Sequence, residues 1–256
     1  MEHEHLILKQ EGPVTRITLN RPERRNALSL DLMSEVIAAL SALPEECRAV
    51  IVEGAGTAFS AGHDLAEMVG QDITYQQELF DVCTELMEQL HAVPQPVIAK
   101  VHGFAFAAGC QLVAACDLAI ASDDARFSTP GLKIGVFCST PAVPVVRAVG
   151  RKRAMHMLLT AEPIAARTAL EWGLVNEVVP ADQLEDAVQH LIGQILRFSP
   201  LVVAMGKEAF YAQIELDEHR AYEVTKTVMA ANAVTADGQE GMEAFVEKRQ
   251  PSWRGR

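Results

Sequence analysis

Two stretches rich in glycine and alanine, residues 55–65 and 103–117, could each present a free backbone N–H group to an oxygen atom. Each follows a run of β-branched and apolar residues, 48–54 and 96–102, that is typical of a buried strand. A tight turn between a strand and a helix start leaves N–H groups without partners. Such groups attract an anion, or an oxygen that becomes negative during a reaction. The same small residues could instead serve only to let a helix pack closely on a sheet.

The elements that must position these stretches alternate between strand and helix up to about residue 195. Strand-type patterns cover residues 6–10, 14–20, 48–54, 96–102, 117–121 and 174–179, and the first two of these are expected to form a hairpin about residues 11–13. Helix-type patterns cover 30–43, 72–93, 151–159, 165–172 and 181–198. Three further helices, 201–214, 218–234 and 239–248, follow without strands between them. Ser29 and Ser199 each precede a helix and are expected to be N-caps. The sequence therefore predicts an α/β fold with a core of residues 1–195 and a helical C-terminal region of residues 196–256.

The composition limits the class of partner and the compartment. With 22 Lys and Arg against 34 Asp and Glu, the net charge is −12, which argues against a nucleic-acid partner because phosphates demand a basic surface. A ligand that carries phosphates could still be held by a local basic cluster. The five cysteines have no paired-motif spacing, so we expect free thiols in a reducing compartment. With no signal peptide and no apolar run long enough for a bilayer, we expect a cytoplasmic protein without a membrane partner.

A third motif precedes the two glycine- and alanine-rich stretches. Residues 20–28 read Asn-Arg-Pro-Glu-Arg-Arg-Asn-Ala-Leu. In this order the three motifs resemble the enoyl-CoA hydratase/isomerase (crotonase) family, from about residue 6 to residue 253. The resemblance implies a spiral of ββα units and an all-helical C-terminal oligomerisation region, which packs against neighbouring subunits in a homotrimer or a dimer of trimers. It also implies an acyl-CoA thioester as partner, with coenzyme A entering as part of the substrate and with no separate cofactor or metal.

The family's shared step holds a thioester carbonyl between two backbone N–H groups while it becomes an enolate or oxyanion. By resemblance, these groups belong to His63, which follows Ser-Ala-Gly at 60–62, and to Ala108, within Ala-Ala-Gly at 107–109. Backbone donors do not depend on side chains, so we expect this feature to survive here. For His63 we expect that only the backbone matters.

The resemblance also implies contacts with the coenzyme A portion of the substrate. Arg24 occupies the position of a basic residue beside the CoA phosphates. Lys248 occupies that of a lysine that meets the CoA phosphate of a neighbouring subunit, although an exposed surface lysine is the alternative. The other candidate contacts are Ala61, Asp64, Leu65 and Gly131.

Both carboxylates of the family's hydratases are missing from this chain. Their positions are Gln111 and Gly131, and efficient hydration is not expected, because an amide cannot take a proton from water near pH 7 and glycine has no side chain. Gln111 lies one helical turn beyond Ala108 and can hold a water or a substrate oxygen. The further acid of the dienoyl isomerases corresponds to Ser139, and the aspartate of the naphthoate synthases corresponds to Cys138.

Several functions are open at this point. We expect an acyl-CoA enzyme of the enoyl-CoA hydratase or isomerase type. One alternative uses the same oxyanion hole for a thioesterase, decarboxylase or lyase reaction with Cys138, Ser139 or water. Cys138 could be a thioester nucleophile beside a histidine, or a buried and inert thiol. Another alternative is a non-catalytic protein that binds acyl-CoA.

Overall fold

The main sheet of the computed structural model, which describes residues 3–255, has six strands in the order β1–β2–β3–β4–β6–β9. The strands are β1 (Leu6–Glu11), β2 (Val14–Leu19), β3 (Ala49–Gly54), β4 (Val97–Val101), β6 (Leu118–Ser122) and β9 (Glu177–Val179). β1 and β2 form the predicted antiparallel hairpin, and each later neighbour pairs in parallel. Parallel strands end at the same edge of a sheet, so the loops after β3 and β4 are brought close together.

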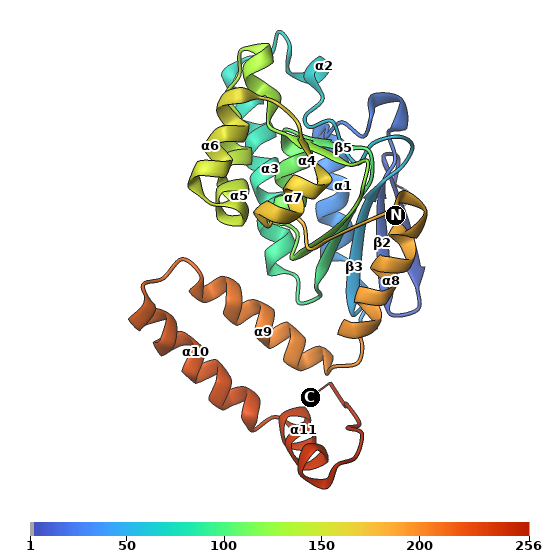
Figure 1. Ribbon diagram of the computed structural model, residues 1–256, viewed down its shortest axis with the longest axis vertical. Helices are drawn as coiled ribbons and strands as arrows, with labels where there is room; N and C mark the ends of the chain where they lie inside the picture. Colours follow the sequence, from blue (N-terminus) through green and yellow to red (C-terminus); the bar gives the residue numbers. More distant parts are fainter. Residues whose placement is uncertain (1–2, 256) are drawn as a thin grey trace.

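Helices cover both faces of this sheet (Figure 1). α1 (Leu30–Ser41), α3 (Ile73–Ala92) and α4 (Ala108–Ala115) lie on one face, and α8 (Leu184–Ile195) lies on the other. Because successive side chains of a strand alternate between faces, Val50 and Val52 of β3 join the larger core and Ala49 and Ile51 pack under α8. Ser29 is the N-cap of α1, as predicted, since its side chain accepts a hydrogen bond from the backbone N–H of Leu32.

A second sheet of three strands was not predicted from the sequence. It is formed by β5 (Phe104–Phe106), β7 (Arg126–Ser128) and β8 (Ile164–Ala165), in the order β5–β7–β8. Strands of two or three residues are too short to show the alternation by which strands are recognised. The remaining elements of the core are α2 (Leu65–Met68), α5 (Ser139–Val149), α6 (Arg151–Thr160), α7 (Ala166–Trp172) and the 3-10 turns Pro22–Arg24, Pro130–Ile134 and Ala181–Gln183. α6 and α7 confirm the helices predicted over 151–159 and 165–172.

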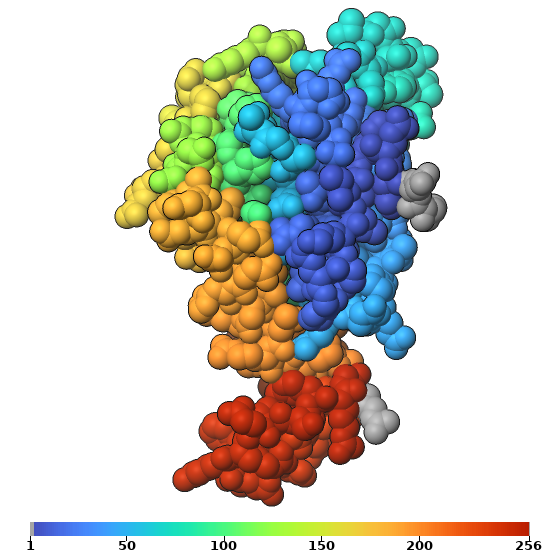
Figure 2. All heavy atoms as spheres, turned by 90° about the vertical axis from the view of Figure 1, so that its right-hand side faces the viewer, coloured from blue at the N-terminus to red at the C-terminus, as the bar shows by residue number. Residues whose placement is uncertain are grey.

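The three predicted C-terminal helices are present as α9 (Pro200–Gln213), α10 (Glu218–Ala233) and α11 (Ala236–Glu247). Ser199 caps α9 by accepting from the backbone N–H of Val202. Figure 1 shows α9 and α10 side by side beyond the core, and Figure 2 shows the C-terminal end, in red, as a protruding lobe. α9 and α10, which the structure describes in full, bury none of their residues. The apolar side chains of α10 therefore have little cover within the chain, whereas most residues of α9 are half-buried.

One largely buried ion pair connects α9 of the C-terminal region to the main sheet. Lys207 Nζ on α9 lies 2.6 Å from Asp117 Oδ2, directly before β6, and also donates to the carbonyl groups of Leu90 and Gln95. The other carboxylate oxygen of Asp117 accepts from the Tyr211 hydroxyl at 2.8 Å. The Lys207 side chain is only 7% exposed, and removing one partner of a buried pair leaves an uncompensated charge. α9 is therefore held on the core independently of α10 and α11.

Across residues 3–255, no single helix is long and apolar enough to cross a bilayer. One pair, Ala181–Ile195 with Pro200–Gln213, would suffice by length and composition, and these two are bent by 99° at the break between them.

Candidate active site

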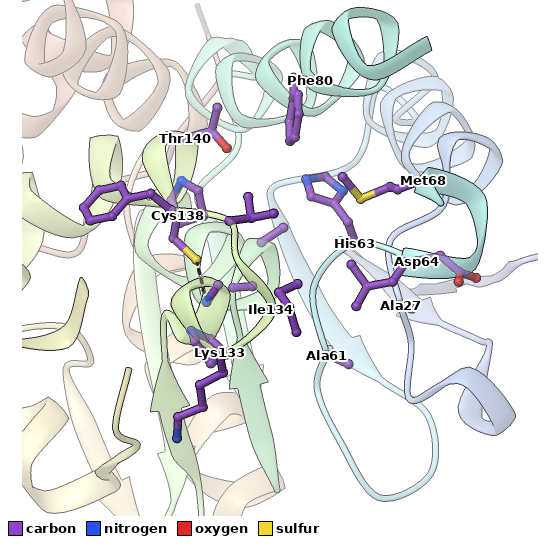
Figure 3. A pocket seen from close by; sticks show the side chains of 18 of the residues that line it. Ala27, Ala61, His63, Asp64, Met68, Phe80, Lys133, Ile134, Cys138 and Thr140 are labelled. Atoms are coloured by element: carbon purple, nitrogen blue, oxygen red, sulfur yellow. Dashed lines mark hydrogen bonds between the residues drawn. The ribbon is translucent and has the colours of Figure 1, made fainter. Parts of the chain in front are cut away.

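A cavity of about 830 Å³ lies beside the start of α4 (Figure 3). The residues predicted from the sequence that line it are Arg24, Ala61, His63, Asp64, Leu65, Ala108, Gly131, Cys138 and Ser139. Apolar side chains that sequence reasoning had not assigned to the site form much of the remaining wall: Met68, Phe80, Ile134, Val136 and Phe137. Phe80 lies on α3, and nothing in its sequence spacing separates a core residue from a cavity residue. Gln111 and Lys248 do not line the cavity.

Hydrogen bonds of Ser60 and Asn26 join the three sequence motifs into one unit. Ser60 accepts from the N–H of Phe106 and donates its own N–H to the carbonyl of Phe104. Its hydroxyl donates to the carbonyl of Asn26 at 2.8 Å, and Asn26 Nδ2 donates to the carbonyl of Ala58 at 2.8 Å. Ser60 and Asn26 are fully buried, so these bonds hold the loop after β3 against β5 without competition from water.

The backbone N–H groups of His63 and Ala108 have no acceptor within residues 3–255. Gly62 brings them together, since a Cβ at this position would lie 3.2 Å from Ala108 N and 2.8 Å from the Cβ of Ala107. Gly62 also has a φ of +96°, which favours glycine. Ala108 is the first residue of α4, and the helix cannot satisfy its N–H. Two free donors so close on one wall of a cavity can bind a single oxygen atom.

Cys138 lies across the cavity from His63 (Figure 3), and it contacts Gly131. The N–H of Gly131 donates to Cys138 Sγ at 3.3 Å. A Cβ at position 131 would lie 2.3 Å from the carbonyl oxygen of Val136 and 2.8 Å from Cys138 Sγ, so a glutamate cannot stand here unless the backbone shifts. Burial raises the pKa of the Cys138 thiol, which disfavours the thiolate that a nucleophile needs.

Gln111 and Lys248 are the predicted site residues that do not line the cavity. Gln111 is 3% exposed, and its Oε1 is 3.9 Å from the thiol of Cys83 on α3. It is therefore buried between α4 and α3, and its predicted contact with a substrate oxygen stays a prediction. Lys248 ends α11 in a left-handed conformation and is exposed on the C-terminal lobe. Its predicted contact with the ligand of a neighbouring subunit also stays a prediction.

Three basic side chains line the cavity and are exposed to solvent: Arg24, Arg25 and Lys133. Lys133 pairs with Glu162 at 3.1 Å, and both side chains are more than half exposed. Such a pair contributes at most about 1 kcal/mol, so a phosphate group can compete for the lysine. Arg24 and Lys133 come from segments more than a hundred residues apart, yet both border one opening.

Asp64 has a structural role in this arrangement. Its carboxylate pairs with Arg21 at 3.0 Å and caps α2 by accepting from the N–H of Ala66. With both oxygens engaged, Asp64 is a weak candidate for proton transfer. In the part of the chain that the structure describes, no group of three or more His, Cys, Asp or Glu side chains could hold a metal ion.

The match with known proteins extends over nearly the whole chain. The family model described as enoyl-CoA hydratase/isomerase matches residues 9–256. The chain belongs to the enoyl-CoA hydratase/isomerase family. The motifs that indicated this family in the sequence are the segments that Ser60 and Asn26 join in the structure.

Individual members of the enoyl-CoA hydratase/isomerase family agree in sequence and in fold. The chain is 45% identical over 248 residues to enoyl-CoA hydratase domain-containing protein 3, mitochondrial, of Rattus norvegicus, which covers 96% of this chain and 83% of that protein. The solved structure of an enoyl-CoA hydratase from Mycobacterium smegmatis superposes with a TM-score of 0.96 at 45% identity, covering 98% of this chain and 99% of that one. Human enoyl-CoA hydratase domain-containing protein 3 gives 0.95 at 41% identity, covering 98% and 100%. The predicted crotonase-like fold with a helical C-terminal region is confirmed.

The cytoplasmic location expected from the sequence is contradicted by these family members. The relatives from Rattus norvegicus, Xenopus laevis and Homo sapiens are all named as mitochondrial proteins. Free thiols suit any reducing compartment, so the cysteines could not distinguish the cytoplasm from another reducing compartment.

Proposed function

We propose that this chain binds an acyl-CoA thioester in the cavity and stabilises the enolate or oxyanion form of its carbonyl. The observation that carries this proposal is the pair of unpartnered N–H groups of His63 and Ala108, held together by Gly62. Negative charge collects on the thioester oxygen as the enolate forms, so fixed donors stabilise that state more than the neutral carbonyl. The apolar wall suits an acyl chain, and the exposed Arg24 and Lys133 suit the CoA phosphates.

The proposed reaction is a slow one of the hydratase or isomerase type. Without carboxylates at Gln111 and Gly131, the chain keeps substrate binding and charge stabilisation but has lost the family's usual proton carriers. A thioesterase reaction through Cys138 is less favoured, because burial raises the pKa of its thiol. A purely binding protein is distinguished from an enzyme by incubation with a panel of acyl-CoA thioesters, followed by mass analysis for hydration, hydrolysis or decarboxylation and by chromatography for isomerisation, which leaves the mass unchanged.

Calorimetry with butyryl-CoA, which has no double bond to hydrate, tests the binding step. We expect saturable binding. The thioether S-butyl-CoA, in which a methylene replaces the carbonyl, should bind at least about tenfold more weakly, because two hydrogen bonds of about 1 kcal/mol each are lost. Equal affinity for the thioester and the thioether would contradict the role of the two N–H groups. The absence of any binding would contradict the proposal as a whole.

The proposed enzyme assembles through its C-terminal helices into a homotrimer or a dimer of trimers. Large apolar side chains on α10, α11 and the turn between them are strongly exposed: Met229 70%, Val234 76%, Phe245 85% and Val246 79%. Exposed apolar groups of this size suit a subunit interface. Deleting residues 215–256 keeps α9 and its Lys207–Asp117 pair, and we expect a folded monomer in light scattering. An oligomer of unchanged stoichiometry would refute this assignment.

A further inference from the structure

The imidazole ring of His63 stands in the cavity with one nitrogen unpartnered. Figure 3 shows the ring between Met68 and Phe80, with Cys138 on the far side of the cavity. Its Nε2 is buried and has no hydrogen-bond partner within residues 3–255. Most buried polar atoms in proteins are paired, so an exception on a cavity wall marks a place where a ligand or a water molecule can supply the partner.

Two contacts fix the orientation and the tautomer of the His63 ring. Phe80 packs edge-on against it, with ring centroids 5.5 Å apart and an interplanar angle of 82°. Nδ1 lies 3.4 Å from the carbonyl oxygen of Leu28. A carbonyl oxygen can only accept, so Nδ1 carries the proton and Nε2 keeps its lone pair. The lone pair is therefore left without a donor, in a residue that lines the same cavity as Ala108 and its free N–H group.

The surroundings keep this ring neutral at pH 7. Burial lowers the pKa of His63, and the contact with the Leu28 carbonyl offsets only part of this effect. The other titratable side chains that line the cavity are Arg24, Arg25, Asp64, Lys133 and Cys138. The elements beside it also carry Glu67 on α2 and Tyr75, Glu78, Asp81 and Cys83 on α3. The Asp64 charge is compensated by Arg21, and Glu67 accepts from the N–H of Leu30.

We propose that Nε2 of His63 is the proton acceptor of this site, in place of the two missing glutamates; this rests on the proposed function. As a water oxygen bonds to the β-carbon of an enoyl thioester, Nε2 takes a proton from the water and the double-bond electrons move onto the thioester oxygen. The N–H groups of His63 and Ala108 hold that oxygen. The imidazolium then returns the proton to the α-carbon as the enolate collapses, so only water is consumed.

The substitution His63→Gln tests this role, because it keeps the backbone N–H and a polar side chain but removes the proton acceptor. His91→Gln is the matched control. His91 is also partly buried with a lowered pKa caused by burial, bonds to the Ala115 carbonyl at 2.9 Å, and does not line the cavity. Circular dichroism checks that both variants fold.

We expect kcat/KM for crotonyl-CoA to fall by about 10²–10⁴-fold in His63→Gln and to be unchanged in His91→Gln. The wild-type rate should rise with pH as His63 loses its proton, with a midpoint below the ordinary value of 6.5. This pH dependence should be absent from His63→Gln, while binding of butyryl-CoA is retained.

A wild-type rate in His63→Gln would overturn the inference and leave the proposed function standing. So would a wild-type protein that binds butyryl-CoA but does not hydrate crotonyl-CoA. If none of the three proteins binds butyryl-CoA, the proposed function fails and the inference fails with it.

Discussion

Hydration of crotonyl-CoA by this chain is expected to be at least about 10²-fold slower than by a family member that carries both glutamates, since positioned acid–base groups contribute about 10²–10⁴-fold. Gln111 is buried behind the cavity wall and Gly131 has no side chain. Neither position can therefore move a proton, and a single imidazole would have to serve both steps. The loss of enoyl-thioester absorbance under identical conditions measures the difference. A hydration rate equal to that of the glutamate-bearing enzyme would contradict this prediction.

Gly131→Glu is not expected to restore this rate. Its Cβ would lie 2.3 Å from the backbone carbonyl oxygen of Val136, so the carboxylate can enter the cavity only if the segment moves. Leu132→Glu is the matched control, because this neighbour is 42% exposed and accepts the same charge without a clash. If the Gly131→Glu variant has the turnover of a glutamate-bearing relative, the prediction is wrong, and the backbone around Val136 moves readily enough to admit the carboxylate.

Ala108→Pro is expected to lower turnover by about 10²–10³-fold, the cost measured where one oxyanion-hole donor is removed from an enzyme. Proline has no backbone N–H, and the first position of a helix is the one that best tolerates it. Ala108 is the first residue of α4, but Ala107 before it has a φ of 48° and a ψ of −117°, which a following proline disfavours, so we expect a local shift of the helix start in addition to the loss of the donor. The same variant should bind butyryl-CoA more weakly in calorimetry.

Ile73→Pro is the control for this experiment. Ile73 is the first residue of α3, is 71% exposed and does not line the cavity. It should keep the wild-type turnover, while circular dichroism and thermal unfolding show whether Ala108→Pro is folded. A folded Ala108→Pro protein with full activity would mean that the N–H of Ala108 does not hold the thioester oxygen.

Local patterns were sufficient for most of the long elements of this fold, although the helix α5 was not predicted. The hairpin of β1 and β2, the N-caps Ser29 and Ser199, and the three C-terminal helices were all predicted, because each depends on residues a few positions apart. Backbone donors could also be predicted, since a glycine- and alanine-rich turn before a helix leaves N–H groups free whatever the side chains are. The division near residue 195 stays a prediction.

Contacts that appear only in the folded chain decided the rest. The sequence shows that position 131 lacks a carboxylate, but only the fold shows that Val136 and Cys138 fill the space a glutamate would need. For His63 the sequence supported a role of the backbone alone. The free Nε2 depends on Leu28 and Phe80, which lie 35 and 17 positions away along the chain. Such features depend on which groups meet in space, and local hydrophobic periodicity carries no record of these contacts.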